Sequence, residues 1–222
     1  SGGQAAHVAL VRALAARPAV LIVDEPLAAV DVKSAERWRH FLHAARADRT
    51  TLLVTHDALD IAHLAQDMLV MESGQVRAHG ATARLLEAPP TGFVAALAGL
   101  NRLEGTVTEI GASAVEVACG DITVLAATEH SSLAPGQEVA VTFDPHAATI
   151  GAAPEASNQW AARVLAVEAT SLAAAQLRVD LGGQEATVPV DREFALGVAV
   201  GNIVSLTCLL YTSDAADEED SV

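Results

Sequence analysis

The chain has 222 residues, with 28 acidic and 13 basic side chains, and its formal net charge is −15. This acidity argues against nucleic-acid binding, because the neutralisation of phosphates requires a basic surface, and against unaided docking on anionic lipid. Hydrophobic residues make up 51% of the chain, so a folded protein is expected. The two cysteines, Cys119 and Cys208, are too few for a disulfide framework and have no CxxC spacing for zinc.

Charge is spread unevenly along the chain. Residues 1–100 carry a net charge of −1, residues 101–208 a net charge of −9, and residues 209–222 a net charge of −5. The hydrophobic pattern changes at the same places, and no apolar run approaches the roughly 18–20 residues of a membrane-spanning helix. We therefore expect one domain over 1–100, a second over 101–208 and a tail over 209–222.

The first of these segments alternates helix and strand signals. Residues 4–16 are strong helix formers with one apolar face, and Pro18 ends that helix. Residues 20–23 form a β-branched run without alternation, which is typical of a strand buried on both faces of a parallel sheet. A helix over 34–47 with Ser34 as its N-cap and a second buried strand over 51–55 are predicted next.

The same alternation continues to the end of this segment. We expect a helix over 58–66, a small hairpin over 68–79 with its turn at Ser73-Gly74, and helices over 82–87 and 91–99. Strand–helix–strand order predicts a parallel α/β sheet.

Residues suited to catalysis follow both predicted strands. The first strand ends in Asp24-Glu25, and the second is followed by His56. Ligands of parallel α/β sheets bind beyond the carboxyl ends of the strands, so these side chains are expected to share one site. There, one carboxylate can hold Mg²⁺, the other can deprotonate an attacking water, and the imidazole can hydrogen-bond a terminal phosphate.

A glycine-containing start precedes the first predicted helix. Ser1-Gly2-Gly3-Gln4 offers free backbone N–H groups and the positive end of a helix dipole, which together bind anions. Taken singly, a Gly-Gly pair is an ordinary loop signal and an Asp-Glu pair an ordinary turn. Their joint occurrence in this order favours a phosphate site.

These motifs resemble the second half of an ABC-transporter ATPase over residues 1–100. Ser1-Gly2-Gly3-Gln4 resembles the signature motif, Asp24-Glu25 the end of the Walker B motif, and Leu27 to Asp31 the D-loop; Val54-Thr55-His56-Asp57 resembles the H-switch. The resemblance implies that Asp24 supports Mg²⁺, Glu25 polarises the attacking water and His56 holds the γ-phosphate of ATP. It also implies that Ser1, Gly2, Gly3 and Gln4 contact ATP bound on a partner subunit, and that Asp31 lies at the dimer interface.

The sequence departs from that family at several points. Val30 stands where leucine is commoner, and no G-x-x-x-x-G-K-[ST] motif occurs anywhere. We therefore expect a P-loop NTPase fragment that lacks its N-terminal half and is inactive alone. A non-transport ABC ATPase is the alternative that the lack of a basic patch argues against.

The second segment carries short strand patterns over 105–110, 114–118, 122–126 and 138–143. Residues 162–168 resemble 103–109, and residues 201–206 resemble 136–141, which predicts a duplication with an offset of 57 to 65 residues. We expect two five-stranded units, about 102–150 and 158–208, forming an all-β pair of OB-like barrels. A linker rich in alanine and proline is predicted over 151–157.

This arrangement resembles the TOBE, or molybdate-binding-like, module of importer ATPases. Residues 156–158, Ala-Ser-Asn, partly match the Ser-Ala-Arg-Asn start of molybdate-binding modules. The resemblance favours import of molybdate or tungstate, with other solutes such as sulfate, iron, polyamine or sugar as alternatives. A cytoplasmic oxyanion-binding or regulatory module is a further alternative, although the net charge of −9 disfavours oxyanion binding.

The importer resemblance also implies partners and a location. We expect a homodimer of ATPase subunits on the cytoplasmic face of the cell membrane, bound to permease subunits that receive solute from a periplasmic or lipoprotein binding protein. Residues 209–222 resemble translated adapter sequence or a disordered acidic tail, and we assign them no function.

Overall fold

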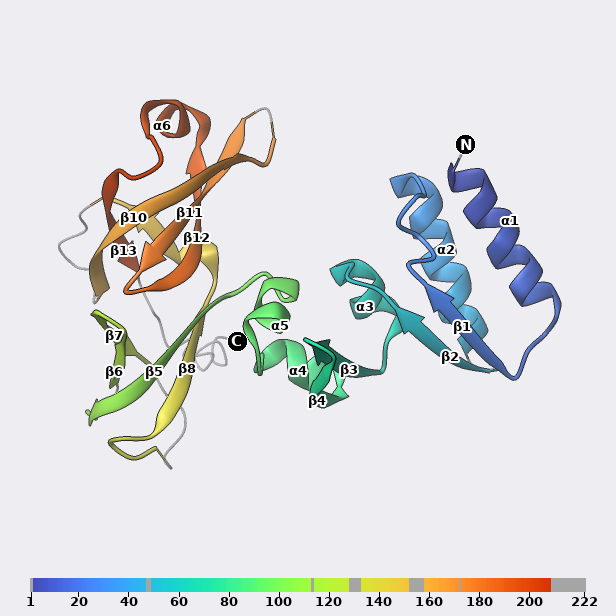
Figure 1. Cartoon of the computed structure of the whole chain (residues 1–222), viewed down its shortest axis with the longest axis horizontal. Helices are drawn as coiled ribbons and strands as arrows, with labels where there is room; N and C mark the ends of the chain where they lie inside the picture. Colours follow the sequence, from blue (N-terminus) through green and yellow to red (C-terminus); the bar gives the residue numbers. More distant parts are fainter. Residues whose placement is uncertain are drawn as a thin grey trace, which may run out of the picture. The chain divides into compact units, whose positions relative to one another are not determined.

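The computed structural model (Figure 1) describes residues 2–46, 49–112, 114–127, 133–151, 158–171 and 173–208. The predictions for Ser1, for the tail over 209–222 and for most of the linker fall outside these residues. The chain divides into two compact units, Ser1–Ala98 and Gly99–Val222. Within the described part, no helix is long and apolar enough to cross a membrane.

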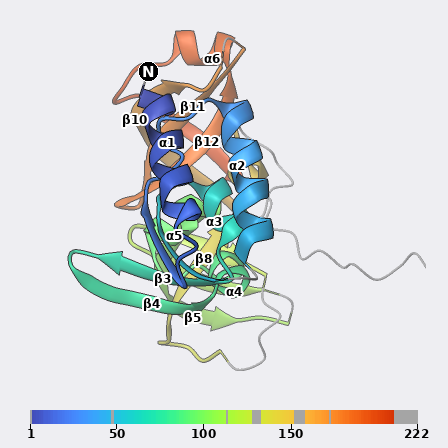
Figure 2. The ribbon, with the colours of Figure 1, turned by 90° about the vertical axis from the view of Figure 1, so that its right-hand side faces the viewer.

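The first unit begins with a parallel strand pair covered by two helices. Its elements are α1 (Gly2–Ala15), β1 (Val20–Asp24), α2 (Val32–Ala45) and β2 (Thr50–Val54), and the strands align from Val20 opposite Thr50 to Asp24 opposite Val54. Figures 1 and 2 show α1 and α2 side by side. Leu10, Leu21 and Leu42 form the core between the helices and the sheet. The predicted parallel α/β order is confirmed.

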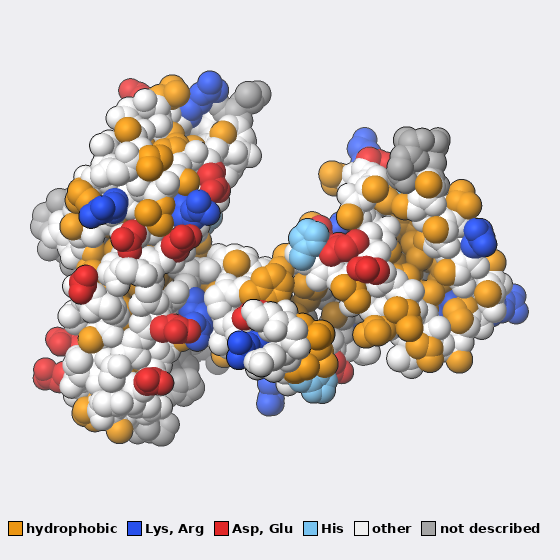
Figure 3. Space-filling model, in the orientation of Figure 1, with side chains coloured by type: hydrophobic (Ala, Val, Ile, Leu, Met, Phe, Trp, Pro, Cys, Tyr) orange, Lys and Arg blue, Asp and Glu red, His pale blue; other side chains and the backbone are white. Residues whose placement is uncertain are grey.

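The prediction that both strands are buried on two faces is wrong for this chain. Ile22 is 67% exposed and Leu52 opposite it is 55% exposed, whereas Leu21 is 3% exposed. Successive side chains of a strand point to opposite faces, and α1 and α2 cover one of them. Figure 3 shows the resulting hydrophobic side chains on the surface of this unit.

The predicted cap of the second helix is also wrong. α2 begins two residues earlier than expected, and Asp31 is its N-cap, accepting a hydrogen bond of 3.1 Å from the Ser34 backbone N–H. Aspartate and serine are both good N-caps. The extended backbone of Asp31 (φ −63°, ψ 154°) decides between them, because Ser34 already lies inside the helix.

The rest of the first unit follows the predicted order. It comprises α3 (Ala58–Leu64), the antiparallel hairpin of β3 (Asp67–Glu72) and β4 (Gln75–Ala81), α4 (Thr82–Glu87) and α5 (Gly92–Leu97). Ser73 and Gly74 both have positive φ, 51° and 74°, as a two-residue type I′ turn requires. A separate core of Ile61, Met68, Val70 and Val94 holds this part together.

The described residues of the second unit form antiparallel strands and one short helix. A four-stranded sheet has the order β7-β6-β5-β8 and a five-stranded sheet the order β12-β11-β10-β13-β9. One continuous core, including Leu103, Val124, Leu177 and Leu206, joins the two sheets. The elements are β5 (Asn101–Ile110), β6 (Val115–Cys119), β7 (Ile122–Ala126), β8 (Glu138–Phe143), a 3-10 turn (Pro145–Ala147), β9 (Ala148–Ile150), β10 (Asn158–Ala169), β11 (Ala174–Leu181), β12 (Gln184–Asp191), α6 (Arg192–Gly197) and β13 (Ile203–Cys208).

The two halves of the second unit share a pattern of strand pairing, and its details differ from those of the predicted duplication. Asn101 pairs with Phe143 at one end of the first copy, and Asn158 pairs with Cys208 at the same place in the second. This correspondence aligns Leu103 with Trp160, so the segment alignment that placed Leu103 opposite Ala162 is shifted by two residues. The two five-stranded units are not separate either. β9 leaves the first copy and pairs with β13 of the second, which a strand pattern read along the chain does not reveal.

The two copies are joined by reciprocal side-chain amide contacts. The Asn101 amide bonds the backbone of Thr187 at 2.7 and 2.8 Å, and the Asn158 amide bonds the backbone of Leu125 at 2.7 and 2.9 Å. Both asparagines are buried, 5% and 3% exposed. Each amide therefore satisfies one donor and one acceptor in the other copy, as buried backbone groups require.

Candidate functional site

A sharp turn after β1 positions the first candidate residue. Glu25 has a φ of 43°, in the left-handed region that a residue with a side chain seldom adopts. Its backbone N–H donates to the carbonyl of Val54, at the end of β2, over 2.9 Å. The parallel pairing of the strands and this bond together carry the Glu25 carboxylate to the carboxyl end of the neighbouring strand.

The Glu25 carboxylate meets three groups of the segment that follows β2. Its Oε1 lies 2.6 Å from His56 Nδ1 and accepts the His56 backbone N–H at 3.1 Å, and its Oε2 accepts the Thr55 hydroxyl at 3.4 Å. The hydrogen bond to the Glu25 carboxylate, and then the negative charge of that carboxylate, raise the pKa of His56 above its ordinary value. The expectation that the two strand ends bring Glu25 and His56 together is confirmed.

This pair has the accessibility that a reaction centre needs. The His56 side chain is 77% exposed and the Glu25 side chain 33% exposed. A partly exposed carboxylate can accept a proton from water. A neighbouring imidazole can donate a hydrogen bond to an anion when it is protonated or in the matching tautomer.

The start of α3 fixes the backbone on the other side of His56. Asp57 is the N-cap, and its Oδ1 accepts the backbone N–H groups of Leu59 and Asp60 at 2.8 and 3.0 Å. The Thr55 hydroxyl accepts the Asp57 backbone N–H at 3.1 Å. Sequence reasoning placed Asp57 near a helix start but gave no role to Thr55, whose polar side chain beside His56 was the available signal.

A cation from another helix completes this network. Arg39 of α2 donates from Nε to Asp60 Oδ1 at 2.5 Å and from Nη2 to Asp57 Oδ1 at 3.4 Å. Burial raises the pKa of the Asp60 carboxyl, and the Arg39 guanidinium opposes that rise. The sequence gives no local sign of this contact, because Arg39 and Asp60 lie 21 residues apart.

The other predicted site residues have different placements. Gly2, Gly3 and Gln4 form the first turn of α1, so the helix starts earlier than expected. Asp31 caps α2, and its hydrogen bonds with Ser34 lower the pKa of its carboxyl. The structure therefore gives Asp31 a local helix-capping contact.

Asp24 is an exposed carboxylate at the last position of β1. Among the described residues there is no group of three or more histidine, cysteine, aspartate or glutamate side chains that could hold a metal ion. Mg²⁺ is usually bound through one or two carboxylates, substrate phosphates and water. Asp24 therefore fits a Mg²⁺ ion that phosphates would bring with them.

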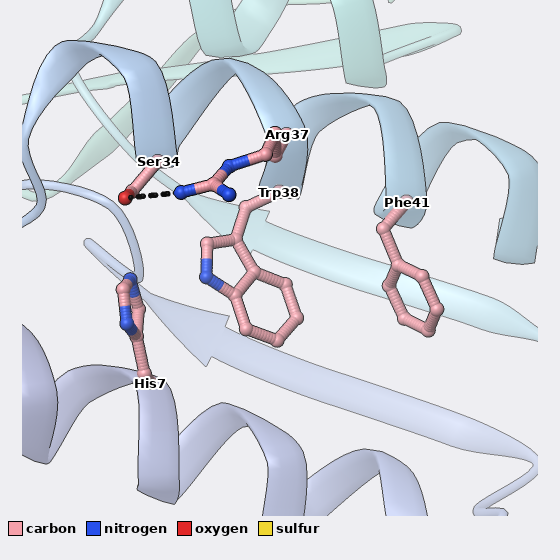
Figure 4. A pocket seen from close by; sticks show the side chains of 5 residues that line it. All are labelled: His7, Ser34, Arg37, Trp38 and Phe41. Carbon is pink, nitrogen blue, oxygen red and sulfur yellow. Dashed lines mark hydrogen bonds between the residues drawn. The ribbon is translucent and has the colours of Figure 1, made fainter.

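A groove of about 320 Å³ lies between α1 and α2 (Figure 4). His7 of α1 faces Trp38 of α2 with ring centroids 5.6 Å apart, and Trp38 meets Phe41 edge to face at 5.7 Å. Arg37 donates to the Ser34 hydroxyl at 3.1 Å. These side chains contact one another, and none of them is among the residues around Glu25 and His56.

Comparison with known proteins gives matches to both units. Residues 154–208 match the TOBE domain family. The chain is 47% identical over 109 residues to the molybdenum import ATP-binding protein ModC of Mycobacterium tuberculosis strain H37Rv, covering 48% of this chain and 30% of that protein. It is 35% identical over 228 residues to the sulfate/thiosulfate import ATP-binding protein CysA 1 of Chromobacterium violaceum, covering 99% and 61%.

Two further matches complete the comparison. The sn-glycerol-3-phosphate import ATP-binding protein UgpC of Paraburkholderia xenovorans is 42% identical over 118 residues, covering 50% of this chain and 32% of that protein. The solved structure of the cytoplasmic molybdate-binding protein ModG, with molybdate bound, has 26% identity and a TM-score of 0.42, covering 50% of this chain and 90% of that one. The chain spans between about 30% and 61% of the length of these import proteins. The chain is similar over 99% of its length to an import ATP-binding protein, and its residues 154–208 match the TOBE domain family.

Proposed function

We propose that this chain is part of the ATP-hydrolysing subunit of an ABC importer, with residues 1–100 belonging to its P-loop NTPase domain. The contact of Glu25 with His56 at the ends of two parallel strands carries the proposal, because it joins a general base to a phosphate-binding group. The similarity to ATP-binding proteins of importers supports the same conclusion.

The proposed roles follow from the placement of each group. Glu25 accepts the proton of the attacking water, and His56 holds the γ-phosphate of ATP. Asp24 binds Mg²⁺, which supplies charge stabilisation to the phosphates when it is bound. Ser1, Gly2, Gly3 and Gln4 contact ATP held by a second subunit, through backbone N–H groups at the start of α1, and Asp31 lies at that dimer interface.

A substitution at Glu25 tests these roles. The experiment uses the longest natural protein that contains this sequence and measures ATP turnover with Mg²⁺. Glu25→Gln should slow hydrolysis about 10²–10⁴-fold, the usual contribution of a general base, and trap an ATP-bound dimer. Glu36→Gln, an exposed position on α2, is the matched control. Rapid hydrolysis by Glu25→Gln would remove Glu25 as the base.

Molybdate or tungstate is the proposed solute. The 47% identity to a molybdenum import protein supports it, although the match to a sulfate/thiosulfate import protein covers more of the chain. The proposed partners are a second ATPase subunit, membrane permease subunits and, through them, a periplasmic or lipoprotein binding protein. The proposed location of the subunit is the cytoplasmic face of the cell membrane.

The second unit itself can be tested for oxyanion binding. Calorimetry on the 222-residue chain with molybdate, tungstate and sulfate separates these anions directly. Heat with molybdate and tungstate but not sulfate supports the proposed solute class. Heat with sulfate alone favours sulfate import, and no heat with any of the three assigns the β-module to a regulatory or dimer-stabilising role.

A further inference from the structure

We propose that Arg39 is a positioning residue that fixes the start of α3 and thereby holds His56 against Glu25. The inference rests on the proposed function, since His56 and Glu25 are the groups proposed to act on ATP. It adds a residue of α2, remote in sequence from both strand ends, to the structure that orients them.

The Arg39 side chain is held in one position by a buried ion pair. Its side chain is 13% exposed, and it donates to Asp60, whose side chain is 3% exposed, over 2.5 Å. A buried carboxylate without a partner is costly, so the guanidinium and this carboxylate are held together. α2 and the first turn of α3 are thereby joined by a contact with little freedom.

The ion pair of Arg39 with Asp60 is linked to the backbone of His56 through Asp57 and Thr55. Arg39 Nη2 lies 3.4 Å from Asp57 Oδ1, the same oxygen that caps α3. Thr55 accepts the Asp57 backbone N–H and donates to Glu25. His56 therefore lies between two residues whose positions are fixed, and its own backbone N–H points to Glu25 Oε1 at 3.1 Å.

The shape of the Arg39 guanidinium allows it to contact two carboxylates at once. Nε of Arg39 reaches one carboxylate while Nη2 reaches a second, three residues earlier in the same segment. A planar guanidinium spans two acceptors in a fixed geometry, whereas a lysine ammonium is a single point charge on a flexible stem. Lysine at position 39 is therefore expected to keep charge balance at Asp60 and to lose the restraint on Asp57.

The experiment follows His56 and the capped amides by NMR in the 222-residue chain, without nucleotide. In Arg39→Gln, loss of the contact with Glu25 should lower the pKa of His56 toward its ordinary value of about 6.5, whereas loss of the Arg39 charge without any displacement of His56 would raise it. The Leu59 and Asp60 amides should exchange about fivefold to tenfold faster, the effect of weakening an N-cap. Arg39→Lys should give a smaller shift in the same direction. Arg37→Gln, an exposed arginine on the same helix, should change neither readout.

The outcomes separate this inference from the proposed function, because neither readout requires ATP. An unchanged His56 pKa and unchanged amide exchange in folded Arg39→Gln would overturn the positioning role, even if the intact protein hydrolyses ATP. If Arg39→Gln does not fold, Arg39→Lys decides: wild-type values for both readouts overturn the proposal. The expected shifts, together with no ATP turnover by the intact protein, would sustain the positioning role and refute the proposed function.

Discussion

The two units differ in how their hydrophobic cores are arranged. In the second unit a single core runs through both sheets, and its members include Val164, Leu177, Val179 and Leu181, all fully buried. In the first unit the described core consists of two small clusters, one around Leu21 and the other around Ile61. The β-module thus carries one continuous hydrophobic core, whereas the described core of the unit with the candidate site is divided into two.

Polar side chains also have different uses in the two units. Groups that react must reach solvent and ligand, and the segment from Thr55 to Asp60 is organised by hydrogen bonds and ion pairs near the surface. The β-module uses its polar side chains to close the contact between its two copies, as Asn101 and Asn158 do. Substitutions in the two units should therefore have different kinds of consequence.

The largest effect is expected at the meeting point of the two copies. A Cβ at Gly120 would collide with the Gly182 carbonyl oxygen, and Gly120 has a φ of +60°. Gly120→Ala should destabilise the β-module by about 1–3 kcal/mol from overpacking, plus about 1–2 kcal/mol for the left-handed backbone. Gly136→Ala has a φ of +85° but open space and should show the second effect alone. Equal losses of unfolding free energy in the two variants, measured by denaturant titration of the β-module signal, would contradict this account.

An effect of similar size distinguishes the two faces of β1. Leu21→Ala should cost the first unit about 2–5 kcal/mol, because Leu21 is 3% exposed in its core. Ile22→Ala, one residue later and 67% exposed, should stay within about 0.5 kcal/mol. Hydrogen exchange of β1 and β2 amides measures both losses in this unit alone. A large loss for Ile22→Ala would show that this face is covered in solution.

A smaller effect is expected at the amide contacts between the copies. Asn158→Ala leaves a partly buried donor and acceptor of Leu125 unpaired and should cost about 1–3 kcal/mol. Gln159→Ala, the exposed neighbour, should be within about 0.5 kcal/mol of wild type. Chemical denaturation followed by Trp160 fluorescence is a suitable measurement. Should the two variants lose equal stability, the amide contact would not be what joins the copies.

The smallest effect concerns the pH dependence of the site. The pKa of His56 is raised in the folded chain, so its contact with Glu25 stabilises the first unit fully below about pH 6.5. That contribution is lost as the pH rises through the raised value. Thermal unfolding of the first unit across this window should show the loss in wild type and not in Glu25→Gln. The same slope in both proteins would disconnect His56 from Glu25.

Local rules in the sequence were sufficient for much of the first unit. Strand–helix alternation and the polar residues after each strand predicted that Glu25 and His56 meet, because parallel strands end at the same edge. The hairpin was predicted from the turn signal at Ser73-Gly74; Gly74 suits a positive φ, and Ser73 adopts one as well in the structure. The sequence signals behind both predictions are local: they consist of the periodicity of each segment and the residues that directly follow it.

The tertiary structure decided what depends on residues far apart in the chain. The exposure of Ile22 depends on which face the helices cover, and the contact of Arg39 with Asp60 depends on how α2 meets α3. β9 joins the second sheet by pairing with β13, which lies more than fifty residues later in the chain. A sequence pattern specifies which side chains a segment offers, but a long-range contact also requires the geometry of the segment that receives it.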